Sequence, residues 1–254
     1  MKKIAISVDL DDAWCGFKKE DTFLSEAFQN IFSLFKNKKK PTLFIIGKDI
    51  NMNKTNLRKA VKMGFELGNH GFSHNYLDGL NKIKIKKEIC STHKALKKFG
   101  PVISFRAPGW SSNIHTDKIL AELGYKNDAS RVNGLSFLIL KVIHFIHARR
   151  ITKIFGRFSY QIFQNSFPKN EVLKYLYLKT VCGIPFYNSM LKYFPNSFNI
   201  FLIKISTLFN IRSYIFHARD FTNKNIYKTG LILSILSQNY TLTSIRYLNQ
   251  KFKE

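Results

Sequence analysis

The sequence predicts an α/β fold in a single domain, with parallel strands that form an open sheet or a barrel. Short apolar segments of strand type alternate with amphipathic segments of helix type along most of the 254 residues, a pattern typical of βαβ units. Carboxylate, histidine and arginine side chains stand where several expected strands end, which is where α/β folds bind ligands. No internal repeat, low-complexity segment or Pro/Ser-rich linker occurs, so we expect one domain over residues 1–254.

The first half of the chain opens with a β-branched run that ends in a carboxylate, which predicts a strand. The next stretch repeats apolar residues at helical spacing, with Phe23, Ala27, Ile31 and Leu34 in one row. Strands are expected at Lys3–Asp9, Pro41–Gly47, Phe65–His70, Val102–Trp110 with a break at Pro108 and Gly109, and Tyr125–Ser130. Helices are expected at Asp21–Lys40, Asn53–Gly64 with an Asn cap and a Gly stop, Asn81–Gly100 and His115–Gly124.

The second half is less regular between Gly134 and Asn210, which we expect to be a divergent, insert-like region. Its segments LSFLILKVIHFIHARR and FNIFLIKISTLFNIR are apolar, aromatic and edged with Lys and Arg. Each is a candidate core helix, membrane-surface helix or lid. Regular alternation returns with a strand at Ser213–Phe221, a helix at Lys228–Gln238 and a last strand at Tyr240–Ile245.

The charge balance is strongly basic, with 41 Lys and Arg against 16 Asp and Glu and a formal net charge of +25. Such a surface attracts nucleic acid, anionic lipid or phosphorylated substrates. A lysine-rich composition of the whole proteome is the alternative explanation for most individual lysines. We expect no specific nucleic-acid partner, because no RNP, zinc-finger or helix-turn-helix signature occurs.

The cysteines and the apolar runs bear on the compartment. Cys15, Cys90 and Cys182 are far apart and form no Cys-x-x-Cys pair, as is usual in a reducing compartment. The first apolar run is too short for a signal peptide. The sequence contains no run of eighteen apolar residues, the length needed to span a membrane. We therefore expect a cytoplasmic protein, with peripheral binding to the anionic inner membrane face through its charge and segments such as Phe137–His147.

The stretch GNHGFSHNY places His70 and His74 four residues apart. On a helical turn, two imidazoles at this spacing point at one object, and a divalent metal ion is the obvious candidate. The alternative is a turn that both histidines cap or line without a metal.

Carboxylates follow the first expected strand at Asp9, Asp11 and Asp12. Residues two apart on a strand share a face, so Asp9 and Asp11 point together, and Asp12 is the alternative if the strand has already turned. One carboxylate with the histidine pair makes a metal site with positions open for water and substrate. A second carboxylate beside that water is a natural general base. For each Asp alone, a helix N-cap is the alternative role.

Four motifs in order, VDLDD, NHGFSH, FRAPGW and YIFHARDF, resemble the polysaccharide deacetylases of carbohydrate esterase family 4. They cover the chain from its start to His217, although Gly134–Asn210 matches little. The motifs VDLD and APGW are also similar to those of bacterial enzymes that deformylate a lipid-linked formamido-arabinose at the cytoplasmic membrane face. The resemblance implies a distorted (β/α) barrel that hydrolyses an acetyl or formyl amide on an amino sugar of a glycan or its lipid-linked precursor.

The resemblance also implies a role for each matching residue and a divalent cofactor, most simply Zn²⁺. The positions match as follows: Asp9 the catalytic base; Asp11, His70 and His74 the metal ligands; Arg106 the arginine that positions the base; Gly109 a backbone N–H donor to the oxyanion; and His217 the general acid. These residue types suit amide hydrolysis, since a metal acidifies its water and polarises the carbonyl. An imidazole can protonate the amine leaving group near neutral pH.

One departure from the family and two rival functions accompany this resemblance. The Asp-Trp segment that holds the late histidine in the family is missing, so Asp128 or Asp220 is expected to orient His217 instead. Trp110 is expected either to line the sugar site or to pack in the core. A non-haem iron oxygenase also uses two histidines and a carboxylate, but it gives His217 no role. A catalytically inactive glycan-binding relative is the second rival.

Overall fold

The computed structural model describes residues 1–11, 22–132, 170–191 and 194–248. Its strands are β1 (Lys3–Leu10), β2 (Thr42–Ile45), β3 (Glu66–Asn69), β4 (Ser104–Phe105), β5 (Asn127–Val132), β6 (Lys174–Leu178), β7 (Thr180–Val181), β8 (Ile184–Pro185), β9 (Ser213–His217) and β10 (Thr241–Thr243). Its helices are α1 (Thr22–Leu34), α2 (Lys54–Lys62), α3 (Lys82–Leu96), α4 (Ile114–Glu122), α7 (Asn188–Leu191), α8 (Asn196–Ser206), α9 (Ile226–Asn239) and α10 (Ile245–Leu248). Single 3₁₀ turns include η1 (Gly47–Asp49), η3 (Pro108–Trp110) and η7 (Ala218–Phe221).

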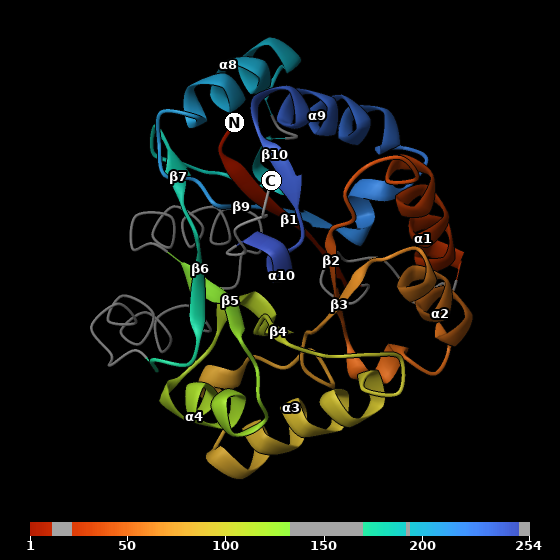
Figure 1. The fold of residues 1–254 in the computed structure, drawn as a ribbon, viewed down its shortest axis with the longest axis vertical. Coiled ribbons are helices and arrows are strands. Elements are labelled where there is room, and N and C mark those ends of the chain that lie inside the picture. The colour runs from red at the N-terminus through yellow and green to blue at the C-terminus, as the bar shows by residue number, and fades with distance from the viewer. Residues whose placement is uncertain (12–21, 133–169, 192–193, 249–254) are drawn as a thin grey trace, which may run out of the picture.

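The main sheet is parallel and nearly closed. Strands β9, β1, β2, β3, β4, β5 and β6 lie side by side in this order. Strand β10 lies on the same side of β1 as β2 and pairs with the first residues of β1. The two outer strands approach one another, because Ser213 Oγ in β9 donates to the carbonyl of Tyr177 in β6. Figure 1 shows helices α1, α2, α3, α4, α8 and α9 arranged around the outside of this sheet, which confirms the predicted barrel.

The inside of the barrel is filled at one end by apolar side chains. Ala5, Phe44, Ala129 and Leu176 come from β1, β2, β5 and β6 and pack with Ile245 and Leu248 of α10 in a single buried cluster. The backbone N–H of Ile245 donates to Thr42 Oγ1 at the start of β2. Helix α10 therefore covers the amino ends of the strands, and the predicted site residues lie at the opposite, carboxyl ends.

The elements predicted from periodicity are present, with differences in detail. The helix expected over Asp21–Lys40 ends at Leu34, and the strand expected over Ser213–Phe221 ends at His217, where η7 follows. The strand expected over Val102–Trp110 is shorter than predicted and forms only β4, while the predicted break at Pro108 and Gly109 is a 3₁₀ turn. Asn53 precedes α2 as expected, but its side chain makes no cap; the amide donates to the carbonyl of Asp49. Gly64 follows α2 with a φ of +89°, a value that suits the expected glycine stop.

The irregular region is partly described. Residues 133–169, which include Phe137–His147, lie outside the described residues, as do Asp12 and Cys15. Beyond them, β6 joins the barrel, β7 and β8 form an antiparallel hairpin, and α8 buries Leu202 and Ile203 while Phe201 is 54% exposed. Helix α8 thus packs by one face only, as a surface helix does.

Two further observations concern the described part of the chain. Its helices include none with the length and apolar content needed to cross a membrane. Cys90 and Cys182 are free thiols.

Candidate active site

The carboxyl ends of four strands bring the predicted residues together. Asp9 of β1 and His217 of β9 are register partners in adjacent parallel strands. His70 and Arg106 leave the neighbouring strands β3 and β4 side by side, since the N–H of Arg106 donates to the carbonyl of Asn69 at 3.0 Å. The order of the strands in the barrel, and not proximity in the sequence, therefore builds the site.

The histidine motif lies in a loop and not on a helical turn, so that part of the sequence interpretation is wrong. Gly71 and His74 adopt φ angles of +74° and +62°, in the left-handed region, which is uncommon for a residue other than glycine. These two residues bend the loop until the imidazole rings of His70 and His74 lie 5.1 Å apart. The expected convergence of the two rings is confirmed, but backbone reversal produces it.

The imidazole of His70 is oriented by its backbone contact. Its Nδ1 lies 2.8 Å from the carbonyl oxygen of Arg106, and a carbonyl can only accept, so Nδ1 carries the proton. The lone pair of Nε2 then points the other way, toward Asp9, whose Oδ2 lies 4.0 Å away. A histidine held through one nitrogen in this manner is a typical metal ligand.

Asp11, His70 and His74 form a candidate metal centre. One potential ligand atom from each residue lies within 4.8 Å of the others, and His74 Nε2 is 3.7 Å from Asp11 Oδ2. Asp11 Oδ1 is buried and has no hydrogen-bond partner in the described part of the chain, a costly state for a carboxylate unless a cation binds it. Three such ligands leave a position open, as catalytic zinc sites do.

The protonation of these groups also suits a cation. Burial lowers the pKa of His70 and of His74 to about 3, so both imidazoles are neutral, which is the form that binds metal. Burial, followed by the nearby charge of Asp9, raises the pKa of Asp11 well above its ordinary value. A divalent ion would remove the cost of ionising Asp11 at this position.

Asp9 is held by a buried arginine. Arg106 Nη1 donates to Asp9 Oδ1 at 2.5 Å, and its Nε donates to the carbonyl of Ala129 at 3.2 Å. The guanidinium also stacks 4.4 Å above the ring of Phe44. With both ends of the guanidinium fixed, one oxygen of Asp9 is occupied by Arg106 and the other faces His70.

The ring of His217 contacts a serine that the sequence did not suggest. Its Nδ1 lies 3.1 Å from Ser189 Oγ, which accepts a hydrogen bond from Arg219 Nη2 at 2.7 Å. Burial lowers the pKa of His217 to about 3; the charge of Asp9 opposes this shift and that of Arg219 reinforces it. Ser189 thus orients this imidazole, and Arg219 adds to the effect of burial in disfavouring its protonation.

The two aspartates proposed to orient His217 have different partners. Asp220 Oδ2 accepts the backbone N–H of His217 at 2.9 Å, so it fixes the backbone of that residue. Asp128 accepts the N–H of Ser130 and lies 3.6 Å from Arg131 Nε. Of the two, Asp220 is therefore the one that supports His217.

Gly109 and Trp110 border the same end of the barrel. Gly109 has a φ of +57°, and a Cβ there would come within 2.2 Å of the Tyr76 ring, so no larger residue fits. The Trp110 ring packs edge-on against Tyr187, with 5.9 Å between centroids, and Tyr187 lies 6.2 Å from the His217 ring. Trp110 is therefore part of an aromatic row beside the site.

Glu88 is a further residue that the motifs did not indicate. Its Oε2 accepts the N–H groups of Phe72 and Ser73, both at 2.8 Å, and its Oε1 accepts the Ser73 hydroxyl. It is the only acidic residue in the basic stretch Asn81–Gly100, which was the one available signal. No comparable signal marks Ser189 or Arg219.

Residues 1–127, half of the chain, match the model of the polysaccharide deacetylase family. The chain belongs to this family. It is also 31% identical over 91 residues to the peptidoglycan-N-acetylglucosamine deacetylase of Bacillus cereus. That match covers 35% of this chain and 42% of the relative, so the chain matches less than half the length of that curated protein.

Solved structures share the fold at low sequence identity. A polysaccharide deacetylase homologue from Mycobacterium smegmatis superposes with a TM-score of 0.64 and 14% identity, over 97% of this chain and 88% of that one. A family 4 carbohydrate esterase from Streptomyces lividans, in complex with acetate, superposes with a TM-score of 0.53 and 12% identity, over 96% of this chain and 91% of that one. A family 4 pseudoenzyme from Bacillus anthracis superposes with a TM-score of 0.57 and 15% identity, over 97% of this chain and 65% of that one.

Proposed function

We propose that this chain is a metal-dependent hydrolase that removes an N-acyl group, acetyl or formyl, from an amino sugar of a cell-surface glycan or its lipid-linked precursor. The observation that carries the proposal is the grouping of Asp11, His70 and His74 next to an aspartate held by Arg106. Family membership and the deacetylase activity named for the B. cereus relative support the same reaction.

The chain's own residues divide the work of amide hydrolysis. A divalent ion, most simply Zn²⁺, would be held by Asp11, His70 and His74 and would polarise the amide carbonyl and acidify a water molecule. Asp9, with one oxygen occupied by Arg106, offers the other to take the proton of the attacking water. The backbone N–H of Gly109 stabilises the developing oxyanion, and His217 protonates the departing amine.

The aromatic row supports a sugar substrate. Trp110 and Tyr187 pack edge to face beside His217, and the indole of Trp110 is partly exposed. A partly exposed aromatic ring offers a flat apolar surface, which suits the face of a pyranose ring. We place the acylated sugar against Trp110.

A second candidate is glycan binding without turnover. Among the described residues, the imidazole of His217 contacts a serine and not a carboxylate, and burial with the charge of Arg219 lowers its pKa to about 3. A histidine that is neutral at pH 7 has no spare proton for the leaving amine. The same fold occurs in a pseudoenzyme of B. anthracis, so this fold is compatible with loss of activity.

Turnover measurements decide between the two candidates. The zinc-loaded chain is incubated with N-acetylated glucosamine oligomers and with lipid-linked glycans, and mass spectrometry detects loss of acetyl or formyl. The expected result is a loss of one acyl mass that needs the metal and disappears in Asp11→Asn. Saturable glycan binding by the loaded protein without any acyl loss would support the non-catalytic candidate.

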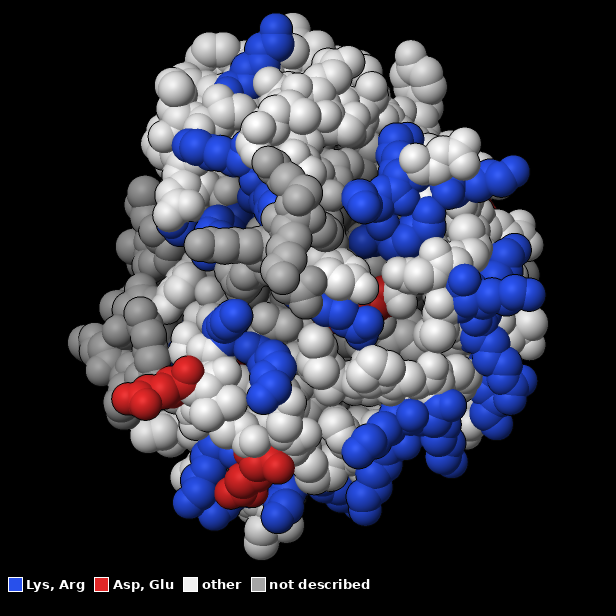
Figure 2. Space-filling model, in the orientation of Figure 1, with Lys and Arg blue, Asp and Glu red and all other residues white. Residues whose placement is uncertain are grey.

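We also propose that the enzyme works in the cytoplasm at an anionic membrane surface. The support is the formal net charge of +25 and the sparse acidic groups on the face drawn in Figure 2. Each Lys or Arg near an anionic bilayer contributes about 1 kcal/mol. Sedimentation with anionic vesicles, but not neutral ones, is expected at low salt, and about 1 M salt should release the protein because the Debye length falls to about 3 Å. Equal binding to both vesicle types would contradict this.

A further inference from the structure

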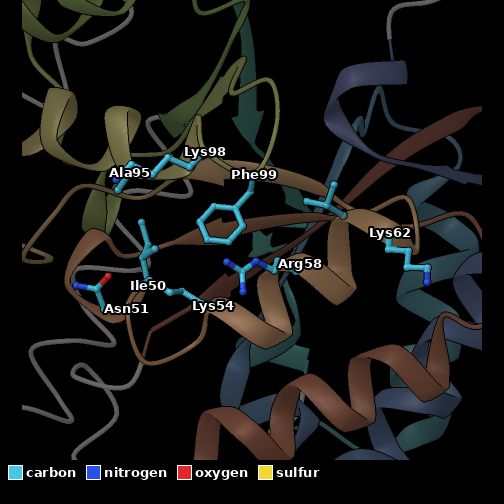
Figure 3. A pocket seen from close by; sticks show the side chains of 9 residues that line it. Ile50, Asn51, Lys54, Arg58, Lys62, Ala95, Lys98 and Phe99 are labelled. Atoms are coloured by element: carbon cyan, nitrogen blue, oxygen red, sulfur yellow. The ribbon is translucent and has the colours of Figure 1, made fainter.

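A groove outside the barrel lies between α2 and the end of α3. Its volume is about 500 Å³, and Figure 3 shows side chains of both elements projecting into it. The cationic residues Lys54, Arg58 and Lys62 come from α2, and Lys98 follows the end of α3. The described residues that line the groove include no acidic one.

The three α2 cations repeat at intervals of four residues and therefore share one face of the helix. Like charges at this spacing destabilise a helix by about 0.2–0.5 kcal/mol per pair, and Lys54 in the first turn also opposes the helix dipole. In the described part of the chain, none of the four groove cations has an ion-pair partner. No described residue therefore compensates their repulsion, and local conflicts of this kind are expected at functional sites.

The floor of the groove is apolar. Val61, Ala95 and Phe99 are partly buried there, whereas the four cations around them are exposed. Figure 3 shows Arg58 and the Phe99 ring both directed into the hollow. A guanidinium matches two phosphate oxygens at once, and lysines add compact charges around it. An apolar floor below such a rim accommodates a carbon skeleton attached to the anion.

The groove is connected to the loop that carries His70 and His74, here called the metal-ligand loop, through η1. The N–H groups of Gly47 and Lys48 in η1 donate to the carbonyls of Gly71 and Phe72, within the loop that carries the two histidines. The chain then runs from η1 directly into the groove at Ile50. A ligand in this groove would therefore sit outside the barrel but next to an element that touches the site.

We propose that this groove is a second binding site, selective for a phosphate group on a lipid headgroup or on a soluble phosphorylated molecule. Figure 2 supports this location, because Lys and Arg gather over α1, α2 and α3 while the most visible acidic groups lie toward α4. The proposal goes beyond the proposed hydrolase function, since binding in the groove requires neither the metal nor turnover. Its use to anchor a phosphate-bearing substrate rests on that function.

The test is a calorimetric titration of the metal-free full chain with inorganic pyrophosphate. The double variant Arg58→Glu/Lys62→Glu reverses two exposed groove charges on a helix that tolerates Glu well. The matched control, Lys118→Glu/Lys126→Glu, makes the same change of net charge at exposed positions on and after α4. The groove variant is expected to weaken pyrophosphate binding at least about tenfold, and the control less than about twofold.

Equal weakening in the two variants would overturn the proposal, because it would show a response to net charge alone. Absence of saturable pyrophosphate binding by the parent would overturn it as well. Vesicles with and without phosphatidylglycerol identify the source of the phosphate. If the groove variant but not the control loses binding to anionic vesicles, the phosphate belongs to a lipid headgroup. If the parent binds pyrophosphate and the groove variant binds vesicles as the parent does, the phosphate belongs to a soluble molecule. Retained turnover of a small soluble substrate by the groove variant separates this test from that of the hydrolase.

Discussion

The carboxylate of Glu88 on α3 accepts both the hydroxyl and the backbone N–H of Ser73, at 2.5 Å and 2.8 Å. Ser73 precedes His74, so this contact ties the metal-ligand loop to a helix outside the barrel. Asn69 supports the same loop from its other end, because its Oδ1 accepts the N–H of Gly71. Glu88 is therefore placed to fix the position of His74 without being one of the three candidate metal ligands.

Replacing Glu88 by Gln should weaken zinc binding by about 10- to 100-fold, the range typical of residues that support metal ligands. Zinc affinity is measured by competition with a chromogenic chelator. Glu66→Gln is the matched control, because Glu66 also accepts three hydrogen bonds, from Thr42, Ser104 and Arg246, but at the amino ends of the strands. Comparable zinc loss in the two variants would mean that Glu88 acts through general stability.

Metal analysis tests the ligand set directly. His70→Ala and His74→Ala should each lose the bound divalent ion, and Asp11→Asn should weaken it, because each change removes one of three ligand atoms that lie within 4.8 Å of each other. His93→Ala is the control, since His93 is buried but contacts the Tyr125 hydroxyl instead. Full metal occupancy in both histidine variants would exclude the site.

Asp9→Asn should keep the metal and lose turnover. The amide retains an oxygen that can accept from Arg106 Nη1, so the local structure is preserved, but it no longer accepts a proton from water. General base catalysis contributes on the order of 100- to 10,000-fold, and kcat should fall within this range with zinc content unchanged. A parent-like rate would remove Asp9 from the role of base.

The Ser189 hydroxyl is expected to orient His217. Ser189→Ala should lower kcat by about tenfold, and His217→Ala should lower it further, both with the metal retained. Ser206→Ala is the matched control, because it removes an equally buried hydroxyl bonded to Ile203 and Tyr240, on α8. If Ser189→Ala and Ser206→Ala reduce stability but leave kcat unchanged, Ser189 has only a structural role.

The strand signals predicted a parallel α/β sheet or barrel, and the family resemblance implied the barrel. The β-branched run of β1 and the apolar rows of α1 are visible without knowledge of their partners. Strands β7 and β8 have two residues each, which is too few to show a period. Strand β6 was not recognised either, although burial alternates along Tyr175–Leu178. Strand β6 is defined by its pairing with β5, which is a tertiary property.

The same distinction applies to the site. Asp9, Asp11, His70, His74, Arg106 and His217 belong to short motifs at strand ends, and the structure brings them together. Ser189 and Arg219 were not recognised, because their contact spans 30 positions and involves common residue types. The loop conformation was mistaken for helical because the spacing of His70 and His74 fits a turn, whereas positive φ angles at Gly71 and His74 determine the real path.

The protonation of His217 gives a last prediction, on stability against pH. Its pKa lies at about 3 in the fold and at 6.5 ordinarily, because burial and Arg219 disfavour its charge more than Asp9 favours it. Arg106 and His70 add to the unfavourable side. Between these two values the unfolded chain binds more protons at this residue, so the free energy of unfolding falls as the pH falls through the window.

His217→Gln removes this titration while keeping a polar side chain of similar size. Urea unfolding of metal-free protein between pH 7.5 and 4.5 should show a shallower loss of stability for the variant than for the parent, by up to about 1.4 kcal/mol per pH unit. His115→Gln, on the exposed start of α4, is the control and should follow the parent. Parallel curves for parent and His217→Gln would show that His217 is not buried in its neutral form, and the argument for a second, non-catalytic function would lose its support.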